Sequence, residues 1–396
     1  MQTLSFESNG STAKIGISGR VDSQNAAAVE AEINDYLATT AHTEVTVDFD
    51  GLEYISSAGL RVLLRLRKSE TGLTVINASA EVFEILDMTG FTEMLPVKKA
   101  YRKISVDGCT KIGEGATGEV YRIDDDIIAK VYFEAYALSG IHRERELARK
   151  AFVLGIPTAI PYDVVKVGER YGSVFELLKA KSMAELIKTD INEVDKCIDL
   201  SVELMKKLHS TAVNEGDLPS AKNTALKNAE YLKTRLPREL AAKFCAMVDE
   251  IPESLNMVHG DLHIKNMMLQ NGELMLIDMD TLSCGHPIFE LCAMYEAYCG
   301  YSEIDKENTF RFFGIKHEIA EYIWHETLCR YLGTYENARL EEIENKIKLM
   351  SYASLYRYFT DTDEPLDENA EACVKAYMRH ITELLNKVNS FAFFDT

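Results

Sequence analysis

The first hundred residues alternate between two hydrophobic periods. Apolar and polar positions alternate over residues 44–49, which is the period-two pattern of a half-buried strand. Leucines then recur at helical spacing between residues 60 and 66, and a strand at 72–77 and a helix at 79–88 follow. This order of elements predicts a small α/β sandwich.

A basic stretch at residues 96–108 interrupts this pattern and predicts a linker followed by a strand. We therefore place a domain boundary near residue 100, with a first domain at 1–100 and a second at 101–396. The length of 396 residues also favours more than one domain, because single cores rarely grow beyond about 250–300 residues.

The second domain opens with three glycines, Gly113, Gly115 and Gly118, in the spacing GxGxxG. In a dinucleotide-binding fold these glycines would follow a strand and open a helix. Here strand-like residues lie on both sides, at 110–112 and 119–123. The pattern therefore predicts a hairpin folded over phosphate groups.

Lys130 lies in the next predicted strand, where its amino group would reach the α- and β-phosphates of a nucleotide. Such a lysine needs an anionic partner to hold it. The helix predicted at 142–152 offers Glu144 and Glu146, and the residues alone leave both open.

The strongest chemical signal lies in residues 257–281. Two short apolar strands flank an Asn-Gly turn, and Asp261, Asn266 and Asp278 lie at their ends. Phosphoryl transfer requires a carboxylate that positions the acceptor hydroxyl and takes its proton, which suits Asp261. It also requires oxygen ligands for Mg²⁺, which suits Asn266 and Asp278. Asp280 is left open between a second metal, a substrate amine and a surface role.

The sequence HGDLHxxN followed by IDxD resembles the aminoglycoside phosphotransferase and choline kinase group of the kinase-like superfamily, over residues 110–295. The resemblance implies a bilobal protein-kinase-like fold that uses ATP and Mg²⁺. Its N-lobe would span about residues 101–178 and its C-lobe about 179–396. Where the lobes join, backbone groups between Glu176 and Leu178 would contact the adenine.

The same resemblance assigns roles to the residues named above. Asp261 is expected as the catalytic base, with Asn266 and Asp278 as magnesium ligands. Lys130 is expected on the phosphates, paired with Glu144, because Glu144 occupies the position of the family's glutamate.

Two features favour a small acceptor. Ordinary protein kinases carry HRD, DFG and a long activation segment, whereas this chain has HGD, IDMD and then a helix predicted near Pro287, which leaves no platform for a peptide. In the resembled family the C-terminal helices wall the acceptor pocket, and aromatics with Glu or Asp suit an amine-bearing molecule. We expect most of these aromatics in the core. They are Tyr295, Tyr298, Tyr301, Phe310, Phe312, Phe313, Tyr322 and Trp324.

Residues 1–100 resemble the STAS domain of anti-sigma factor antagonists, on the match of Ile55–Leu60 to the family signature. In that family a partner kinase phosphorylates a serine that corresponds to Ser57. Ser56 stands where many members have aspartate, and Ala58 where many have serine. The alternative is that Ser56 or Ser57 only caps a helix. The resemblance implies an anti-sigma factor or another signalling protein as a partner.

Charge, hydropathy and cysteine spacing restrict the binding partners and the location that we expect for this chain. The net charge of −20 argues against nucleic acid as a binding partner, because binding to its phosphates needs a basic face. No stretch approaches the roughly 18 apolar residues of a membrane helix, and no signal sequence is visible, so we expect no membrane contact and a cytoplasmic location. The eight cysteines show no CxxC spacing, which suits reduced thiols.

Two functions follow from these patterns. We favour an ATP-dependent phosphotransferase that moves the γ-phosphate to a hydroxyl of a small, amine-bearing acceptor, with residues 1–100 as a regulatory or docking module. The alternative is a signalling kinase in a partner-switching pathway that phosphorylates protein, including Ser57.

Overall fold

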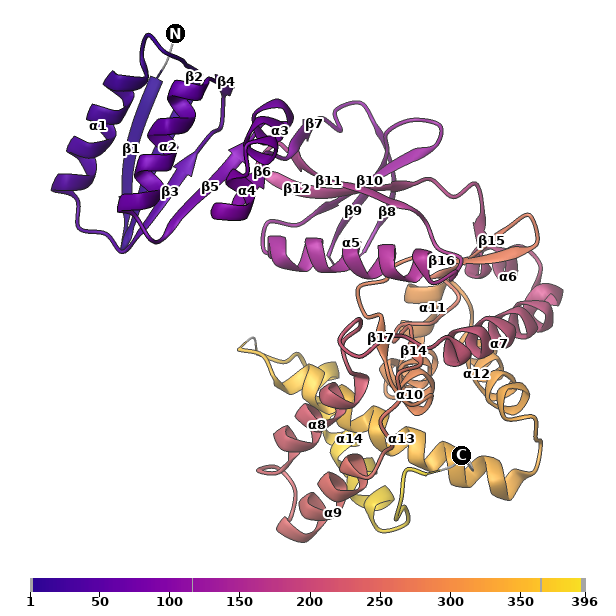
Figure 1. Cartoon of the computed structure of the whole chain (residues 1–396). Coiled ribbons are helices and arrows are strands. Elements are labelled where there is room, and N and C mark those ends of the chain that lie inside the picture. Colours follow the sequence, from indigo (N-terminus) through magenta and orange to yellow (C-terminus); the bar gives the residue numbers. More distant parts are fainter. Residues whose placement is uncertain (1–2, 116, 364, 393–396) are drawn as a thin grey trace. The chain divides into compact units, whose positions relative to one another are not determined.

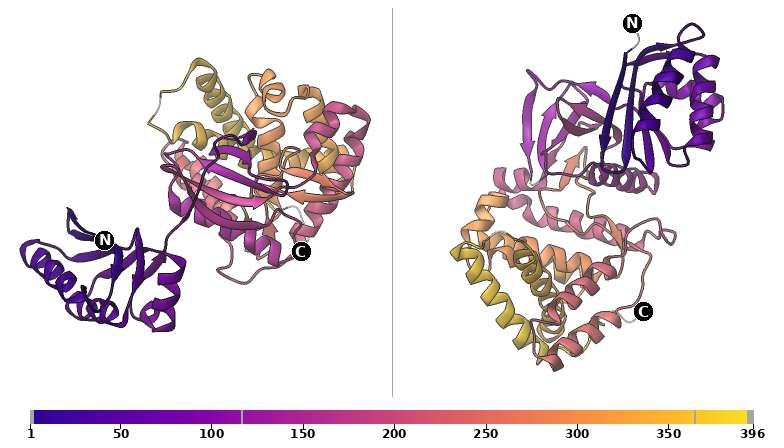
Figure 2. Two further views of the ribbon diagram at one scale, coloured as in Figure 1. Left: turned by 90° about the horizontal axis from the view of Figure 1, so that it is seen from above. Right: turned by 90° about the vertical axis from the view of Figure 1, so that its left-hand side faces the viewer.

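The computed structural model describes residues 3–115, 117–363 and 365–392. The chain separates into two compact units, residues 1–105 and 106–396, whose elements are shown in Figures 1 and 2. Each unit has its own apolar core. The boundary expected near residue 100 falls close to this division.

The first unit is a mixed sheet with helices packed on it. Its strand order is β1-β2-β3-β5-β6, with β4 paired to β2; β1 is antiparallel to β2, and the other pairs are parallel. The apolar positions predicted for residues 44–49 are buried, since Val45, Val47 and Phe49 all lie in the core. Asp48, on the opposite face, is buried as well and forms an ion pair with Lys14 at 3.0 Å. The elements are β1 (Thr3–Asn9), β2 (Thr12–Val21), α1 (Ala26–Thr39), β3 (Glu44–Asp48), β4 (Leu52–Ile55), α2 (Ser57–Ser69), β5 (Leu73–Ala78), α3 (Ala80–Met88), α4 (Phe91–Met94), β6 (Val97–Lys99) and β7 (Arg102–Ile104).

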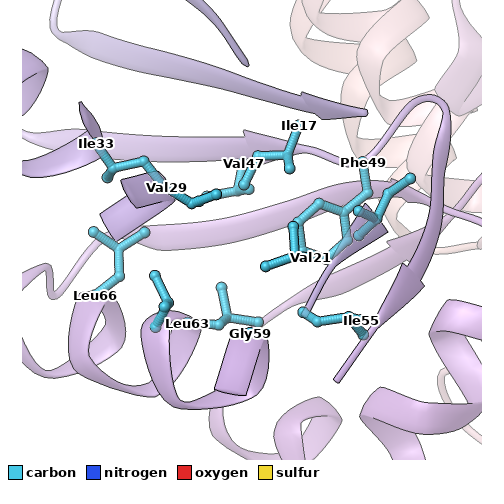
Figure 3. Close-up of a pocket in the computed structure, with 12 residues that line it drawn as sticks. Ile17, Val21, Val29, Ile33, Val47, Phe49, Ile55, Gly59, Leu63 and Leu66 are labelled. Carbon is cyan, nitrogen blue, oxygen red and sulfur yellow. The ribbon is translucent and has the colours of Figure 1, made fainter. Parts of the chain in front are cut away.

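Helices α1 and α2 close this core against the sheet, and Figure 3 shows Gly59 and Leu63 of α2 on the side that faces Val47 of β3. A Cβ atom on Gly59 would lie 2.7 Å from Ile55 Cγ1 and 2.9 Å from Val21 Cγ1, so only glycine permits this approach. A cavity of about 20 Å³ remains. Its lining is apolar and offers water no hydrogen-bond partner, so it is a packing void.

The second unit begins with an antiparallel sheet in the order β11-β12-β10-β9-β8. Helix α5 runs along one side of this sheet (Figure 1) and contacts β11 and β12. The strands predicted on both sides of the three glycines are present as β8 and β9. The elements are β8 (Thr110–Glu114), β9 (Gly118–Arg122), β10 (Ile127–Tyr132), α5 (Leu138–Val153), β11 (Pro161–Val167) and β12 (Arg170–Glu176).

The rest of the second unit is mainly helical. A hairpin of β15 and β16 turns at Asn271 and Gly272, both with positive φ, as the Asn-Gly sequence predicts. The elements are β13 (Lys181–Ser182), α6 (Met183–Thr189), a 3₁₀ turn (Ile191–Glu193), α7 (Val194–Ser210), α8 (Ala221–Leu232), α9 (Arg238–Asp249), β14 (Met257–Val258), β15 (Met267–Gln270), β16 (Glu273–Leu276), β17 (Ser283–Cys284), α10 (Ile288–Tyr298), a 3₁₀ turn (Gly300–Ser302), α11 (Glu307–Phe313), α12 (His317–Leu332), α13 (Asn337–Thr360) and α14 (Glu368–Leu385).

The expectation that most C-terminal aromatics are core is only half right. Tyr295, Tyr298, Phe313 and Trp324 are buried, and Tyr301 is half-buried. The other three named aromatics are exposed because they lie on the outward sides of the short helix α11 and of α12; they are Phe310, Phe312 and Tyr322.

The cysteines occur as reduced thiols, as their spacing predicts. All eight cysteines are free thiols, and five of them are buried. Within the described ranges, no helix combines the length and the apolar character needed to cross a bilayer.

Candidate active site

Lys130 is held between two carboxylates. Its Nζ lies 2.8 Å from Glu144 Oε1 on α5 and 3.0 Å from Asp278 Oδ1, beyond β16. Burial alone would lower the pKa of Lys130, but the charges of these two neighbours outweigh it and raise the pKa. Of the two glutamates left open by the residues, the structure therefore brings Glu144 to Lys130. Glu146 instead pairs with the exposed Arg149, at 2.7 Å.

The glycine hairpin borders the strand that carries Lys130. Gly118 lies directly opposite Tyr132 of β10, and a Cβ atom there would meet Val131 O and lie 2.9 Å from Tyr132 Cα. Gly118 is therefore required by the close approach of the two strands. A Cβ atom on Gly115 would meet open space, and one on Gly113 only Val120, which leaves room for a bound group. The residue between Gly115 and Thr117 lies outside the described residues.

A buried glutamate holds the loop that carries Asp261. Glu290 of α10 accepts the backbone N–H of His259 at 2.6 Å and that of Gly260 at 3.1 Å. The ring of His259 donates from Nε2 to Ile277 O at 3.3 Å and accepts the Asp261 N–H on Nδ1 at 3.2 Å. Burial lowers the pKa of His259, so the neutral ring can make both bonds. The sequence does not single out Glu290, because an acidic residue in the first turn of a helix is common.

Asp261 lies in a cluster of like charges. Asn266 Nδ2 donates to Asp261 Oδ2 at 2.9 Å, and His263 Nε2 lies 3.5 Å from Asp261 Oδ1. Desolvation, and then repulsion from Asp278, raise the pKa of Asp261 to about 7, although about 40% of its side chain is exposed. The same two causes raise the pKa of Asp280 to about 6.

Asp278 has an unusual backbone conformation. Its φ is 62°, in the left-handed region of the backbone that residues other than glycine rarely adopt. Such strain persists only where surrounding contacts impose it, and it is concentrated at functional sites. Here the contact is the ion pair of Asp278 with Lys130.

Residues 176–178, the segment between the two lobes, include one backbone N–H group that donates to no acceptor among the described residues. The N–H groups of Glu176 and Leu177 donate to Ile160 O at 3.0 Å and to Asp126 O at 2.8 Å. The Leu178 N–H has no acceptor among the described residues. Because buried backbone donors are nearly always paired, this N–H is available to a ligand.

The donor set suits magnesium. Asn266 and Asp278 supply amide and carboxylate oxygens, which Mg²⁺ prefers, and the mutual repulsion of Asp261, Asp278 and Asp280 would be relieved by a cation. In the described part of the chain, no three His, Cys, Asp or Glu side chains form a complete metal site. Two protein ligands fit Mg²⁺, which usually completes its shell with water and phosphate.

The comparison with known families agrees with this geometry. The model of the phosphotransferase enzyme family matches residues 108–316, which is more than half of the chain and includes the glycine hairpin, Lys130, Asp261 and Asp278. This chain belongs to the phosphotransferase enzyme family. The predicted fold class, an α/β sandwich of the STAS type followed by a bilobal kinase-like phosphotransferase, is confirmed.

The first unit of this phosphotransferase belongs to a second family. A STAS-domain model matches residues 4–96. A Bordetella bronchiseptica protein described as an anti-sigma factor antagonist, BtrV, is 35% identical over 85 residues, covering 20% of this chain and 72% of that protein. The resemblance to STAS domains is therefore confirmed.

Solved structures with similar folds come from both families. A thermostable mutant of aminoglycoside phosphotransferase APH(4)-Ia, in complex with ADP and hygromycin B, is 11% identical, with a TM-score of 0.47, over 70% of this chain and 93% of that chain. A choline/ethanolamine kinase family protein from Mesorhizobium loti is 14% identical, with a TM-score of 0.45, over 70% and 87%. An anti-sigma factor antagonist from Mycobacterium paratuberculosis is 23% identical, with a TM-score of 0.23, over 25% and 86%. The family assignment rests on the family models, not on these scores.

We predict that Asp261→Asn stabilises the second unit of this phosphotransferase above pH 7 when no metal is present. The pKa of Asp261 is about 7 in the folded chain and about 4 when unfolded. The folded state therefore binds more protons between these values, and stability falls as the pH rises from 4 to 7. The variant should gain on the order of 1 kcal/mol at pH 8, since water screens part of the repulsion, and almost nothing at pH 4.

The measurement is urea unfolding in EDTA, followed by the fluorescence of Trp324, the single tryptophan of the chain. Trp324 is buried in the second unit, so its signal reports that unit. An equal gain at both pH values would contradict the charge-cluster explanation.

Proposed function

We propose that this phosphotransferase moves the γ-phosphate of ATP to a hydroxyl group of a small, amine-bearing acceptor. The observation that carries the proposal is the convergence of Lys130, Asp261 and Asp278, from separate parts of the sequence, on one site. Asn266 and Glu144 hold two of these three residues in place.

Each residue has a distinct part in the proposed reaction. Asp261 takes the proton of the acceptor hydroxyl on Oδ1, since Asn266 already occupies Oδ2. A pKa of about 7 lets this carboxylate accept a proton and release it again near neutral pH. Asn266 and Asp278 would hold Mg²⁺, which would supply positive charge to the phosphate oxygens. Lys130 would contact the α- and β-phosphates, for which it exchanges its contact with Asp278.

The nucleotide would enter between the lobes. The free N–H of Leu178 is the donor we assign to the adenine edge, next to Glu176. The open backbone at Gly113 and Gly115 would cover the phosphates, while Gly118 keeps the hairpin against β10.

The surroundings of Asp261 support an amine on the acceptor. Glu296 of α10 is half-buried and accepts a hydrogen bond from Ser354. Burial raises the pKa of Glu296 to about 8, to which the negative charge of Asp261 contributes, and an adjacent ammonium group would reverse this shift. The ring of Tyr301 is half-buried, and besides this burial the charges of Glu296 and Asp261 contribute to raising the pKa of its hydroxyl. Helix α10 begins at Ile288, soon after Asp280, and leaves no room for an activation segment.

The acidic net charge agrees with the absence of a nucleic-acid partner, which stays a prediction. A cytoplasmic location and the docking of residues 1–100 on an anti-sigma factor or another signalling protein are likewise predictions.

We predict that Asp261→Asn lowers kcat for phosphate transfer at least 100-fold, because the acceptor hydroxyl loses its proton acceptor. Turnover of ATP with Mg²⁺ should be measured across a panel of hydroxylated amines, with product detected by mass spectrometry. Asp249→Asn, an exposed carboxylate on α9, is the matched control and should turn over like the unaltered chain. ATP binding without any phosphorylated product would refute a small acceptor.

Glu296→Gln should raise the KM of amine-bearing acceptors roughly 10-fold and leave the KM of ATP unchanged, because one charge next to the ammonium group is lost. Steady-state kinetics with an amine acceptor and its uncharged analogue separate the two effects. Glu307→Gln on α11, whose side chain is exposed, is the control. Equal losses for both acceptors would show that Glu296 does not recognise charge.

A specific observation also supports the signalling alternative. Ser56 is the N-cap of α2, and its Oγ accepts the N–H groups of Ala58 at 3.2 Å and Gly59 at 3.5 Å. The exposed Ser57 hydroxyl makes no hydrogen bond among the described residues. The capping role therefore falls to Ser56, and Ser57 is accessible at the positive end of a helix that favours a phosphate.

If this chain phosphorylates its own kind of STAS domain, incubation with labelled ATP should label the unaltered protein and not Ser57→Ala. Ser56→Ala is the control, because it removes the cap, at a cost of about 1 kcal/mol, but retains the Ser57 hydroxyl. Equal labelling of the unaltered chain and Ser57→Ala would dispose of this version of the signalling role.

A further inference from the structure

A second side chain on β10 points the same way as Lys130. Side chains two residues apart on a strand share a face, so Tyr132 and Lys130 both face α5. The Tyr132 hydroxyl lies 2.9 Å from Glu144 Oε2, while Lys130 Nζ lies 2.8 Å from Glu144 Oε1. The two residues therefore hold the two oxygens of one carboxylate.

The tyrosine hydroxyl is itself anchored from the neighbouring strand. Ser173 of β12 lies directly opposite Lys130, and its Oγ is 3.1 Å from the Tyr132 hydroxyl. A carboxylate can only accept, and a phenol carries one proton, so Tyr132 donates to Glu144 and accepts from Ser173. Tyr132, Ser173 and Glu144 are each at most 2% exposed. These hydrogen bonds are thus shielded from water. A hydrogen bond is electrostatically stronger in the protein interior than in water.

The ring of Tyr132 is fixed by its surroundings as well. The ring of Tyr136 stacks on it, with centroids 5.1 Å apart and an interplanar angle of 13°. Tyr136 in turn lies against the start of α5, where a Cβ atom on Gly140 would be only 2.9 Å from the Tyr136 ring. The hydroxyl of Tyr132 therefore has little freedom to leave Glu144.

We propose that Tyr132, anchored by Ser173, is a positioning residue for phosphate transfer. It holds Glu144 Oε2, so that Oε1 presents the amino group of Lys130 to the nucleotide phosphates. The assignment rests on the proposed function of Lys130. It adds two residues, one on β10 and one on β12, whose effect on the reaction passes entirely through Glu144.

The test is kinetic and uses the full chain. Tyr132→Phe keeps the ring and its stacking on Tyr136 but leaves Glu144 Oε2 buried without a donor. We expect kcat/KM for ATP to fall roughly 10-fold and ATP binding, measured by calorimetry, to weaken in the same direction. Ser173→Ala should show a smaller loss of the same kind. Tyr162→Phe, a half-exposed tyrosine on β11 of the same sheet, is the matched control and should behave like the unaltered chain.

A double-mutant cycle separates positioning from simple core packing. In the Glu144→Gln background, Tyr132→Phe should change kcat/KM for ATP less than twofold, because its route to Lys130 is already broken. A full 10-fold effect in that background, or an unchanged kcat/KM in Tyr132→Phe, would overturn the proposal. If Tyr132→Phe does not fold, Ser173→Ala is placed in the same cycle.

The binding measurement separates this idea from the proposed acceptor. If no acceptor is phosphorylated but the unaltered chain binds ATP, the proposed function fails, and the Tyr132 proposal is still decided by the loss of ATP affinity. If ATP affinity is equal in the unaltered chain, Tyr132→Phe and Ser173→Ala, the positioning role is wrong whatever the acceptor.

Discussion

The site depends on the two ion pairs that the buried amino group of Lys130 forms. This amino group joins β10 to α5 through Glu144 and to the segment beyond β16 through Asp278. An ion pair as buried as Lys130 and Glu144, with 13% and 3% of their side chains exposed, is costly to desolvate. Both oxygens of Glu144 are bonded, Oε1 by Lys130 and Oε2 by the Tyr132 hydroxyl, which offsets part of that cost. Geometry rather than net stability is what such a pair provides.

The loop that carries Asp261 has the opposite electrostatic arrangement. Around Asp261, three carboxylates repel one another, and Asp261 and Asp280 hold protons that free side chains would release. Behind the loop, burial alone would raise the pKa of Glu290, but His209 and His259 outweigh it and lower the pKa. Glu290 therefore stays ionised and can accept two backbone N–H groups at once. Glu290, whose carboxylate is fully hydrogen-bonded, thus supports a loop on which carboxylates repel one another. Binding of a cation and a phosphate would complete this arrangement.

Much of this was predictable from local signals. The alternation at residues 44–49, the strands on both sides of Gly113 and Gly115, and the Asn-Gly turn each express a short-range steric or hydrophobic rule. The roles of Lys130, Asp261, Asn266 and Asp278 followed from their residue types and spacing together with a family resemblance, and they stay predictions. Glu290 and Tyr132 were not foreseen, because a glutamate in a first helical turn and a tyrosine in a buried strand have many commoner explanations.

The sequence by itself determined the two families and the order of elements, and it predicted the reactive side chains, since these depend on local periodicity and on chemistry that few residue types can supply. Only the tertiary structure decided which glutamate pairs with Lys130, which serine caps α2 and which leaves its hydroxyl accessible. It also decided that Asp261 has a pKa near neutrality. The physical reason is that pairing and pKa depend on distance and burial across segments far apart in the chain, such as Lys130 and Asp278. No local pattern encodes those distances.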